Sequence, residues 1–548
     1  KKANSQTYGE LTINNGAVTS GATTLIASNI TLDNFIIQSN ANVTINSGVT
    51  ASTTQMMSSL TPTIPSGTTL TINGTLNANS LTSLTSSGTI TVNSGGVFTA
   101  NNITSSTIST FTNSGTFTAS SLTDLTIATS TTFTVNNFAS TSVPALQTFT
   151  INGTLTHSSG GSIVLDSATT PSLTNVTIGS SGSINVNGKG SAGGTGGAIN
   201  ANGNNGSGTG GGGGGVNLYA GSGGGGAAYG GSGGNGGTGR YSVNYPSGGL
   251  GSTSSFGSSA EPISLGSGGG QGGAAESAYV GGNGGAGGGA IKIIASSAVT
   301  INGSITANGS VGSVGSGGGC SDNYCAGGGG GGSGGSIWIQ ANTIAGNAST
   351  TANGGQGGTG VNGISGYYGG SGGGGSGGRI AMYHTITTYT GNIIATGGAN
   401  NSASGNGASV AGGAGTRSIP AISSLTAICG VGENGCTSAG QSASPQESFR
   451  VNSIAGTATS SIGTYSGTVS KMEISLKDVT TGQWYSTSSN AFNQGSELWF
   501  QPTGTSTWSY NSSGIIWTIN DTYQIRSRAY NTYNVVESTS QSLNFVYT

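Results

Sequence analysis

The sequence has few charged residues. They make up 5% of the 548 residues, and the balance of 12 basic and 14 acidic side chains gives a formal net charge of −2. Binding to nucleic acid or to an anionic membrane surface depends on clustered lysine and arginine, which this chain does not have. Apolar runs are also too short to span a bilayer. We therefore expect no nucleic-acid partner and no membrane insertion.

Proline is scarce, and no segment has the apolar spacing of a helix. There are only 9 Pro beside 109 Gly, and glycine does not recur strictly at every third position, which excludes collagen. Because apolar residues do not recur three and four positions apart, we expect no helix. Ile, Val, Thr, Phe and Tyr instead recur in short alternating runs, and this pattern predicts an ordered all-β protein.

Residues suited to acid-base catalysis are few. His157 and His384 are the only histidines, and neither lies near a Ser, Cys or Asp at a spacing typical of a catalytic site. Between residues 11 and 187 the only acidic side chains are Asp33, Asp124 and Asp166, so paired catalytic carboxylates are not expected. The glycine runs lack the regularly placed Asp of calcium-binding repeats. We expect no enzyme, no cofactor and no metal.

The four cysteines form two close pairs, Cys320 with Cys325 and Cys429 with Cys436. Each pair would close a short loop, which is typical of local disulfides in an oxidising compartment, with free thiols as the alternative. The pairs lack the two-residue spacing of zinc knuckles. This pattern predicts a secreted, extracellular or cell-surface protein.

Residues 1–187 contain a loosely repeated sequence pattern, in which a short strand of alternating residues is followed by a glycine turn. Examples are Leu70-Thr71-Ile72-Asn73-Gly74 and Ile90-Thr91-Val92-Asn93-Ser94-Gly95. Alternation places every second residue on one buried face, and glycine permits the sharp corner. Repetition every twenty-odd residues predicts a β-solenoid (β-helix) stem, with a β-sandwich of many hairpins as the alternative.

Threonine pairs also occur along this region, as in Thr89-Ile90-Thr91, Thr116-Phe117-Thr118 and Thr132-Phe133-Thr134. Flat threonine arrays on solenoids can bind ice. Their intervals in the sequence are irregular, however, and cross-strand threonine ladders stabilise any β-face. The sequence alone therefore favours stabilisation over ice binding.

Residues 188–417 form a glycine-rich β-repeat region. Apolar triplets begin at Ile291, Ile337 and Ile380, 46 and 43 residues apart. A second marker, Ala-Asn-Gly or Ala-Thr-Gly, recurs at nearly the same spacing. Runs such as 210–215, 327–332 and 372–378 resemble the polyglycine-II bundles of receptor-binding adhesins at the tail-fibre tips of T-even phages and of some glycine-rich antifreeze proteins. The resemblance implies glycine strands packed without side chains between them. The alternative is mobile glycine loops on the solenoid surface.

Tyrosines embedded in this glycine are candidate contact residues. Tyrosine gives a large contact area at low entropic cost, although packing of the rings between loops or subunits is an equal alternative. Tyr367 and Tyr368 are adjacent, and the others are Tyr219, Tyr229, Tyr241, Tyr245, Tyr279 and Tyr324.

After a predicted linker with a cysteine loop, residues 418–444, the last part of the chain, 445–548, holds 11 of the 26 charged residues. Its strands resemble bacterial Ig-like and fibronectin-type modules through Met472-Glu473-Ile474-Ser475-Leu476-Lys477-Asp478 and Tyr523-Gln524-Ile525-Arg526-Ser527-Arg528-Ala529. The resemblance implies an Ig-like β-sandwich. Ser527 departs from it, because its face should be apolar. Four tryptophans are candidate contact residues or core residues: Trp484, Trp499, Trp508 and Trp517.

Taken together, the regions resemble large glycine-rich bacterial adhesins and extracellular fibre proteins. The resemblance implies a structural protein without catalysis. We expect the subunit of a self-assembling surface filament, with itself as partner, because coil edges invite the addition of another chain. The alternative is a monomeric cell-surface adhesin that binds glycans or a host or neighbouring cell surface.

Overall fold

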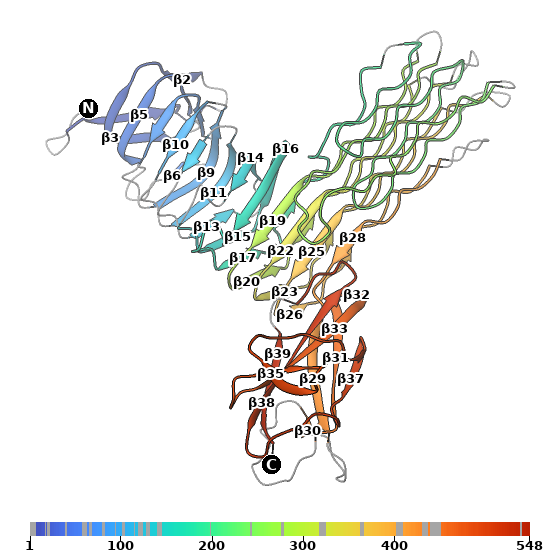
Figure 1. Ribbon diagram of the computed structural model, residues 1–548. Coiled ribbons are helices and arrows are strands. Elements are labelled where there is room, and N and C mark those ends of the chain that lie inside the picture. The colour runs from blue at the N-terminus through green and yellow to red at the C-terminus, as the bar shows by residue number, and fades with distance from the viewer. Residues whose placement is uncertain are drawn as a thin grey trace. The chain divides into compact units, whose positions relative to one another are not determined.

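The computed structural model is all-β, and the residues that it describes contain no helix (Figure 1). In some described strands only the backbone is placed. The described residues are 7–16, 18, 22–38, 41–56, 63–64, 68–78, 83–93, 95–100, 105–113, 116–118, 124–127, 132–139, 145–197, 199–241, 244–275, 279–316, 325–361, 367–401, 409–429, 437–438, 451–537 and 540–547.

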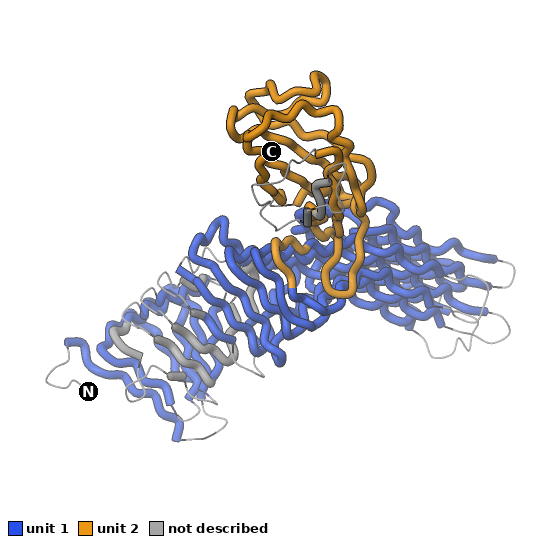
Figure 2. Tube along the Cα trace, turned by 90° about the horizontal axis from the view of Figure 1, so that it is seen from below, with its two compact units in different colours: residues 1–381, 388–417 blue, residues 382–387, 418–548 orange. Residues whose placement is uncertain are grey.

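The chain divides into two compact units (Figure 2). Unit 1 comprises residues 1–381 and 388–417. Unit 2 comprises residues 382–387 and 418–548.

The first part of unit 1 consists of short strands that follow one another around successive coils. They are β1 (Glu10–Asn14), β2 (Thr23–Ile26), β3 (Ile30–Gln38), β4 (Asn42–Ile45), β5 (Thr50–Met56), β6 (Thr63–Ile64), β7 (Thr69–Ile72), β8 (Thr75–Asn77), β9 (Ser83–Val92), β10 (Val97–Thr99), β11 (Ser105–Asn113), β12 (Thr116–Thr118), β13 (Asp124–Ile127), β14 (Thr132–Ala139), β15 (Thr148–Ile151), β16 (Thr154–Asp166), β17 (Asn175–Ile178) and β18 (Ser183–Asn185).

Each of these strands pairs in parallel with the corresponding strand of the next coil. One series runs β4, β7, β9, β11, β14, β16. Another runs β9, β11, β13, β15, β17, because β9 and β11 each turn a corner and belong to both series. A third sheet has the order β1, β3, β5, β8, β10, β12. The stack therefore presents several parallel sheets around one interior.

Alternation of side chains builds that interior. In β7, Leu70 and Ile72 are fully buried, whereas the threonines between them are partly exposed. Glycine forms the corners in two ways. Gly48 has a φ of +75°, which favours glycine. Gly74 has an ordinary φ, but a Cβ there would collide with the backbone oxygens of Asn46 and Val49 in the neighbouring coil.

The parallel stack continues beyond residue 187. β17 pairs with β20 and β18 with β21, and the later coils repeat the same three-strand order. Their strands are β19 (Ala290–Ile294), β20 (Ala298–Ile301), β21 (Ser304–Thr306), β22 (Ser336–Gln340), β23 (Thr343–Gly346), β24 (Thr350–Thr351), β25 (Arg379–Tyr383), β26 (Ile386–Tyr389), β27 (Ile393–Ile394) and β28 (Thr416–Ser418). The predicted 45-residue repeat is thus one coil plus one glycine-rich excursion.

The glycine-rich excursions are extended segments that run alongside one another (Figure 1). Their backbones hydrogen-bond to neighbours on all sides. In residues 221–228, N–H groups three residues apart donate to the same neighbour, as expected for a chain with three residues per turn. The accepting neighbours are residues 325–331, 210–216 and 234–237, and carbonyl groups of the same run accept from 249–252, 270–273 and 370–376. We call these segments together the glycine bundle.

The glycine bundle has backbone where other folds have side chains. Gly224 and Gly330 lie in fully buried runs, and a Cβ on either would approach a neighbouring carbonyl oxygen closer than real Cβ atoms do. Hydrogen bonding of nearly every N–H group offsets the backbone entropy that glycine loses on folding. The described glycine runs are therefore ordered segments, and the alternative of mobile surface loops does not hold for them.

Unit 2 contains two antiparallel sheets around one core. One has the strand order β30, β29, β31, β37, β36, with β32 on β31, and the other β35, β34, β33, β38, β39. The strands are β29 (Ile422–Cys429), β30 (Thr437–Ser438), β31 (Ser453–Ile462), β32 (Tyr465–Gly467), β33 (Val469–Asp478), β34 (Trp484–Ser486), β35 (Ala491–Gln494), β36 (Thr503–Gly504), β37 (Thr507–Asn511), β38 (Thr522–Asn531) and β39 (Gln541–Val546).

The linker predicted over residues 418–444 needs correction in its first part. Residues 422–429 form β29, which pairs with β31 over almost its whole length, so they belong to a sheet of unit 2. Residues 430–436 and 439–444 of the predicted linker lie outside the described residues. Leu425 and Ala421 belong to the same core as Ile454 and Trp508. The small and polar residues around Leu425 hid the strand from sequence analysis, because few of them are strong strand formers.

A buried polar cluster explains the polar residue on the inward face of β38. The Ser527 hydroxyl lies 2.9 Å from that of Ser423, which in turn lies 2.6 Å from the Glu537 carboxylate. All three side chains are buried. Because the serine hydroxyls are hydrogen-bonded, Ser527 fits the register of β38.

Candidate functional site

Tyrosines gather at the end of the glycine bundle remote from the coils. Segments of the bundle join the coils directly, as Gly335 joins Ser336 of β22, and their opposite ends are linked by β-bridges. There Tyr219 stacks on Tyr241 with ring centroids 4.5 Å apart, and Tyr241 lies 5.2 Å from Tyr367. We call these three residues the tyrosine cluster.

The hairpin that carries Tyr241 adds a cation and another ring. The Arg240 guanidinium lies 5.9 Å from the Tyr245 ring, and Tyr245 is 50% exposed. Nε of Arg240 is buried and has no hydrogen-bond partner among the described residues. The same hairpin therefore presents a guanidinium beside exposed aromatic surface.

The two tyrosines predicted as contacts differ in accessibility. Tyr367 is partly exposed and belongs to the tyrosine cluster. Tyr368 is only 5% exposed and forms a backbone β-bridge with Arg240. Its side chain is therefore not available for contact.

Cys325 stabilises the base of this end of the bundle. It is disulfide-bonded and packs with Ala220 and Val361 beneath Tyr241 and Tyr367. Its predicted partner, Cys320, lies outside the described residues. So does Cys436, and the side chain of Cys429 is also outside them, so both pairings remain predictions.

Of the four candidate tryptophans, Trp508 lies in the core of unit 2 and Trp517 packs against that core. Trp508 is 1% exposed, and its Nε1 donates to the carbonyl of Thr457 at 3.2 Å. Trp517 packs against the core and against the rings of Tyr523 and Phe545. These placements fit the core alternative, and Trp508 cannot serve as a contact residue while the unit is folded.

The other two tryptophans lie at the surface under cationic side chains. The Arg528 guanidinium is 4.0 Å from the Trp499 ring, and Lys477 Nζ is 5.1 Å from the Trp484 ring. Arg528 also pairs with Glu473 at 2.6 Å. Burial alone would raise the pKa of Glu473, but hydrogen bonds from Lys471, Arg528 and Tyr530 outweigh it and lower the pKa.

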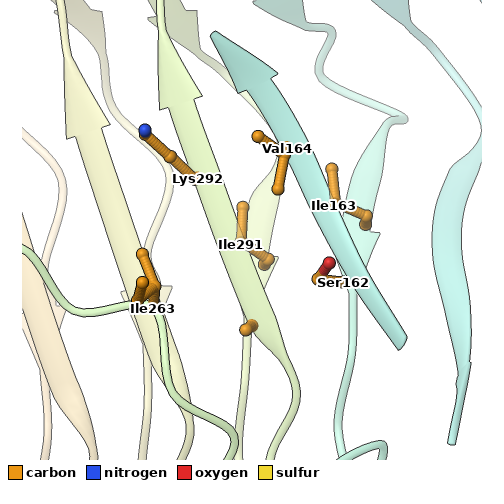
Figure 3. Close-up of a pocket in the computed structure, with 7 residues that line it drawn as sticks. Ser162, Ile163, Val164, Ile263, Ile291 and Lys292 are labelled. Atoms are coloured by element: carbon orange, nitrogen blue, oxygen red, sulfur yellow. The ribbon is translucent and has the colours of Figure 1, made fainter. Parts of the chain in front are cut away.

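A pocket of about 290 Å³ lies beside β16 and β19 (Figure 3). Ile263, from a glycine-rich segment, completes its lining. The ammonium of Lys292 is paired with Asp166 at 2.5 Å and lies 4.5 Å from the Trp338 ring. With its cation paired, the pocket offers mainly apolar surface; its lining is Ser162, Ile163, Val164, Ile263, Ala290, Ile291 and Lys292.

The two histidines are buried. Burial lowers the pKa of His157, whose Nδ1 hydrogen-bonds to the Ser158 carbonyl at 2.7 Å and whose Nε2 accepts from the Ala290 N–H at 3.3 Å. Burial lowers the pKa of His384 to about 4, and neither of its ring nitrogens has a hydrogen-bond partner. Neither ring lies at the pocket of Figure 3 or in the tyrosine cluster.

The described part of the chain contains no group of three or more His, Cys, Asp and Glu side chains arranged to hold a metal ion. It also contains no helix long and apolar enough to cross a membrane.

The sequence indicates the tyrosines of the cluster as candidate contact residues, but it does not indicate Arg240. A single arginine in a glycine-rich run carries no spacing signal, and only the turn of the chain brings it to Tyr245. Comparison with known proteins adds no relative: no family model, no curated protein and no solved structure matches the chain.

Proposed function

We propose that the protein is an extracellular adhesin that contacts a glycan or a cell surface through the tyrosine cluster. The packed rings of Tyr219, Tyr241 and Tyr367 are the observation that carries this proposal; the first two are stacked and the third is tilted against Tyr241. They lie at the end of a bundle whose buried runs are nearly free of side chains. Rigid aromatic rings give contact area at low entropic cost, and a rigid support lowers the cost of binding further.

The proposal includes a finer description of the fold. The parallel coils form a β-solenoid stem, the glycine bundle is a polyglycine-II-type bundle, and unit 2 is an Ig-like sandwich. The three-residue period of the hydrogen bonds supports the second assignment. Two antiparallel sheets over a shared core support the third.

Secretion is part of the same proposal. The disulfide at Cys325 supports an oxidising compartment, where such bonds persist. Low charge and the scarcity of acid-base residues favour contact over catalysis.

The test is binding of the purified full chain to bacterial and animal cells and to a glycan array. Tyr219→Ala and Tyr245→Ala are the test variants, and Tyr8→Ala is the matched control, because Tyr8 is 58% exposed and lies beside β1, far along the chain. We expect specific binding that falls at least tenfold in the double variant and is unchanged in the control. Equal binding by all three proteins, or no binding to any surface, would refute the adhesin.

A second candidate is a filament subunit that self-associates through unit 2. Ile516 and Ile519 are 78% and 65% exposed. The end of the chain lies beside them, because the Asn520 N–H donates to the Tyr547 carbonyl at 2.7 Å. Such apolar side chains suit the centre of a protein interface.

Filament formation is tested by electron microscopy and light scattering of the full chain. The double variant Ile516→Ser and Ile519→Ser should remain monomeric where the native chain polymerises. A native chain that stays monomeric at high concentration excludes this candidate and leaves the adhesin.

A further inference from the structure

Threonines that are irregularly spaced in the sequence form a regular array in the structure. Thr-x-Thr pairs begin at Thr69, Thr89, Thr110, Thr132 and Thr154, between 20 and 22 residues apart. The differences in spacing fall in the corners between strands. The strands that carry the pairs, β7, β9, β11, β14 and β16, are consecutive neighbours of one parallel sheet.

The register aligns the second threonine of every pair into one unbroken column. Thr71 lies opposite Thr91, Thr91 opposite Thr112, and Thr112 opposite Thr134. The column continues to Thr44 at one end and Thr156 at the other. Six successive strands therefore carry threonine at the same position.

The first threonine of every pair forms a parallel column. Thr69 lies opposite Thr89 and Thr89 opposite Thr110, while Thr132 lies opposite Thr154. Since Phe111 lies opposite Phe133, the same register puts Thr110 beside Thr132. We call the two columns together the threonine face.

The threonine face is periodic in two dimensions. Residues between the columns, such as Leu70, Ile90 and Phe133, are fully buried, and the threonines beside them whose side chains are described lie on the outside: Thr69, Thr71, Thr89, Thr91 and Thr132. Neighbouring strands repeat at about 4.8 Å, and threonines two apart on one strand at about 6.6 Å.

Hydroxyl groups on the threonine face are available to water. Thr69, Thr71, Thr89 and Thr91 are partly exposed, and their hydroxyls form no hydrogen bond within the described part of the protein. A ladder that served only to stabilise the sheet would use cross-strand hydroxyl contacts. Among the described threonines of the face, such a contact occurs at the far end, where the Thr154 hydroxyl lies 3.0 Å from that of Ser183.

Another face of the same coils shows what the array requires. Thr107, Thr126, Thr150 and Thr177 are also in register there. The companion column, however, runs Ser105, Asp124, Thr148 and Asn175. That face has one threonine column beside a mixed and partly charged one, so it cannot order water in two dimensions.

We propose that the threonine face binds ice. A single hydroxyl gains almost no free energy when its hydrogen bond to liquid water is replaced by one to a water of the ice lattice, because the two bonds are equivalent. Many hydroxyls and methyl groups held in a regular array would order a shared water layer that merges with the crystal. This function goes beyond the proposed adhesion and uses different residues, so either can fail alone.

The test is incorporation of the fluorescently labelled full chain into slowly growing polycrystalline ice, together with thermal hysteresis. Thr91→Tyr places a ring in the middle of the face, and Thr150→Tyr is the matched control on the other face. Native protein and the control should enter the ice and show hysteresis. Thr91→Tyr should lose at least nine-tenths of both signals, with an unchanged circular dichroism spectrum.

A second pair of substitutions guards against a folding artefact. Thr71→Val with Thr91→Val keeps the shape of the face and removes two hydroxyls, so we expect a partial loss of hysteresis. Exclusion of the native chain from ice, as for an inert protein, overturns the proposal. So does an equal effect of Thr91→Tyr and Thr150→Tyr, which would assign the loss to general disturbance of the coils.

Discussion

The backbone N–H of Gly224 donates to the carbonyl of Gly328 at 2.9 Å, across 104 residues of sequence. Neither residue has a side chain, so the contact has no hydrophobic component. Bonds of this kind, repeated with a period of three, hold the glycine bundle together. The stability of the bundle therefore depends on close backbone approach.

Substituting one buried glycine tests this dependence. A Cβ at position 330 would collide with the carbonyl oxygen of Gly225, and backbone cannot yield as a flexible side chain does. We expect Gly330→Ala to destabilise unit 1 by about 1–3 kcal/mol, the usual cost of overpacking. Chemical denaturation measures this change. Gly495→Ala is the control, since its Cβ would meet nothing within 4 Å, and an equal effect of both substitutions would argue against the packing.

Tyr229 anchors the glycine bundle where it joins the coils. It is fully buried, its hydroxyl lies 2.6 Å from that of Ser336, and its ring lies 4.8 Å from Phe256. We expect Tyr229→Ala to lower stability by about 3–5 kcal/mol, as for other large buried aromatics. Limited proteolysis should show earlier cleavage in the bundle. Cleavage at the native rate would place the anchor elsewhere.

Unit 2 contains two buried groups whose effects on stability oppose each other as pH changes. The pKa of His384 falls from 6.5 to about 4, so the folded state favours its neutral form. Its contribution is complete above pH 6.5 and is lost as pH falls toward 4. The pKa of Glu537 rises from 4.5 to about 7, so the folded state favours its protonated form. Its contribution is complete below pH 4.5 and is lost as pH rises toward 7.

Single variants separate the two effects of pH on the stability of unit 2. His384→Leu should remove the loss of stability between pH 6.5 and 4, and Glu537→Gln should remove the loss between pH 4.5 and 7. Each effect amounts to a few kcal/mol at most, since one pKa unit corresponds to about 1.4 kcal/mol. Tryptophan fluorescence during denaturation reports on unit 2, which holds Trp484, Trp499, Trp508 and Trp517. Identical pH profiles for both variants and the native chain would contradict this assignment.

The cysteine pairing has its own test. We expect non-reducing peptide mapping to link Cys320 with Cys325 and Cys429 with Cys436, because short loops close most easily. Cys325 is disulfide-bonded, so its partner should be found in this map. Free thiols at all four positions would remove the argument for secretion.

Much of the fold followed from local sequence patterns. Alternation predicted strands such as β7 and β38, since every second residue must be buried on a two-faced sheet. The matching spacing of the apolar triplets and of the second marker predicted the coils of the second half. The strand β29 was missed because small and polar residues separate its three large apolar side chains, Ile422, Leu425 and Ile428, and break the strict alternation of a strand.

The relations between distant segments could not be predicted. Glycine carries no side-chain signal, so nothing in residues 221–228 specifies which six segments surround them. The register that aligns Thr71, Thr91 and Thr112 depends on corners of unequal length. Sequence could suggest the tyrosines as contacts, but only the fold separates exposed Tyr245 from buried Tyr368.

Hydrogen exchange of backbone amides in the full chain tests the account most directly. Nearly every amide of residues 221–228 and 327–335 donates a hydrogen bond inside the glycine bundle. We therefore expect these residues to exchange as slowly as strands of the coils, such as β19 and β22. Exchange of these glycine runs within seconds, at the rate of an unstructured peptide, would contradict an ordered bundle and remove the rigid support from the proposed adhesive end.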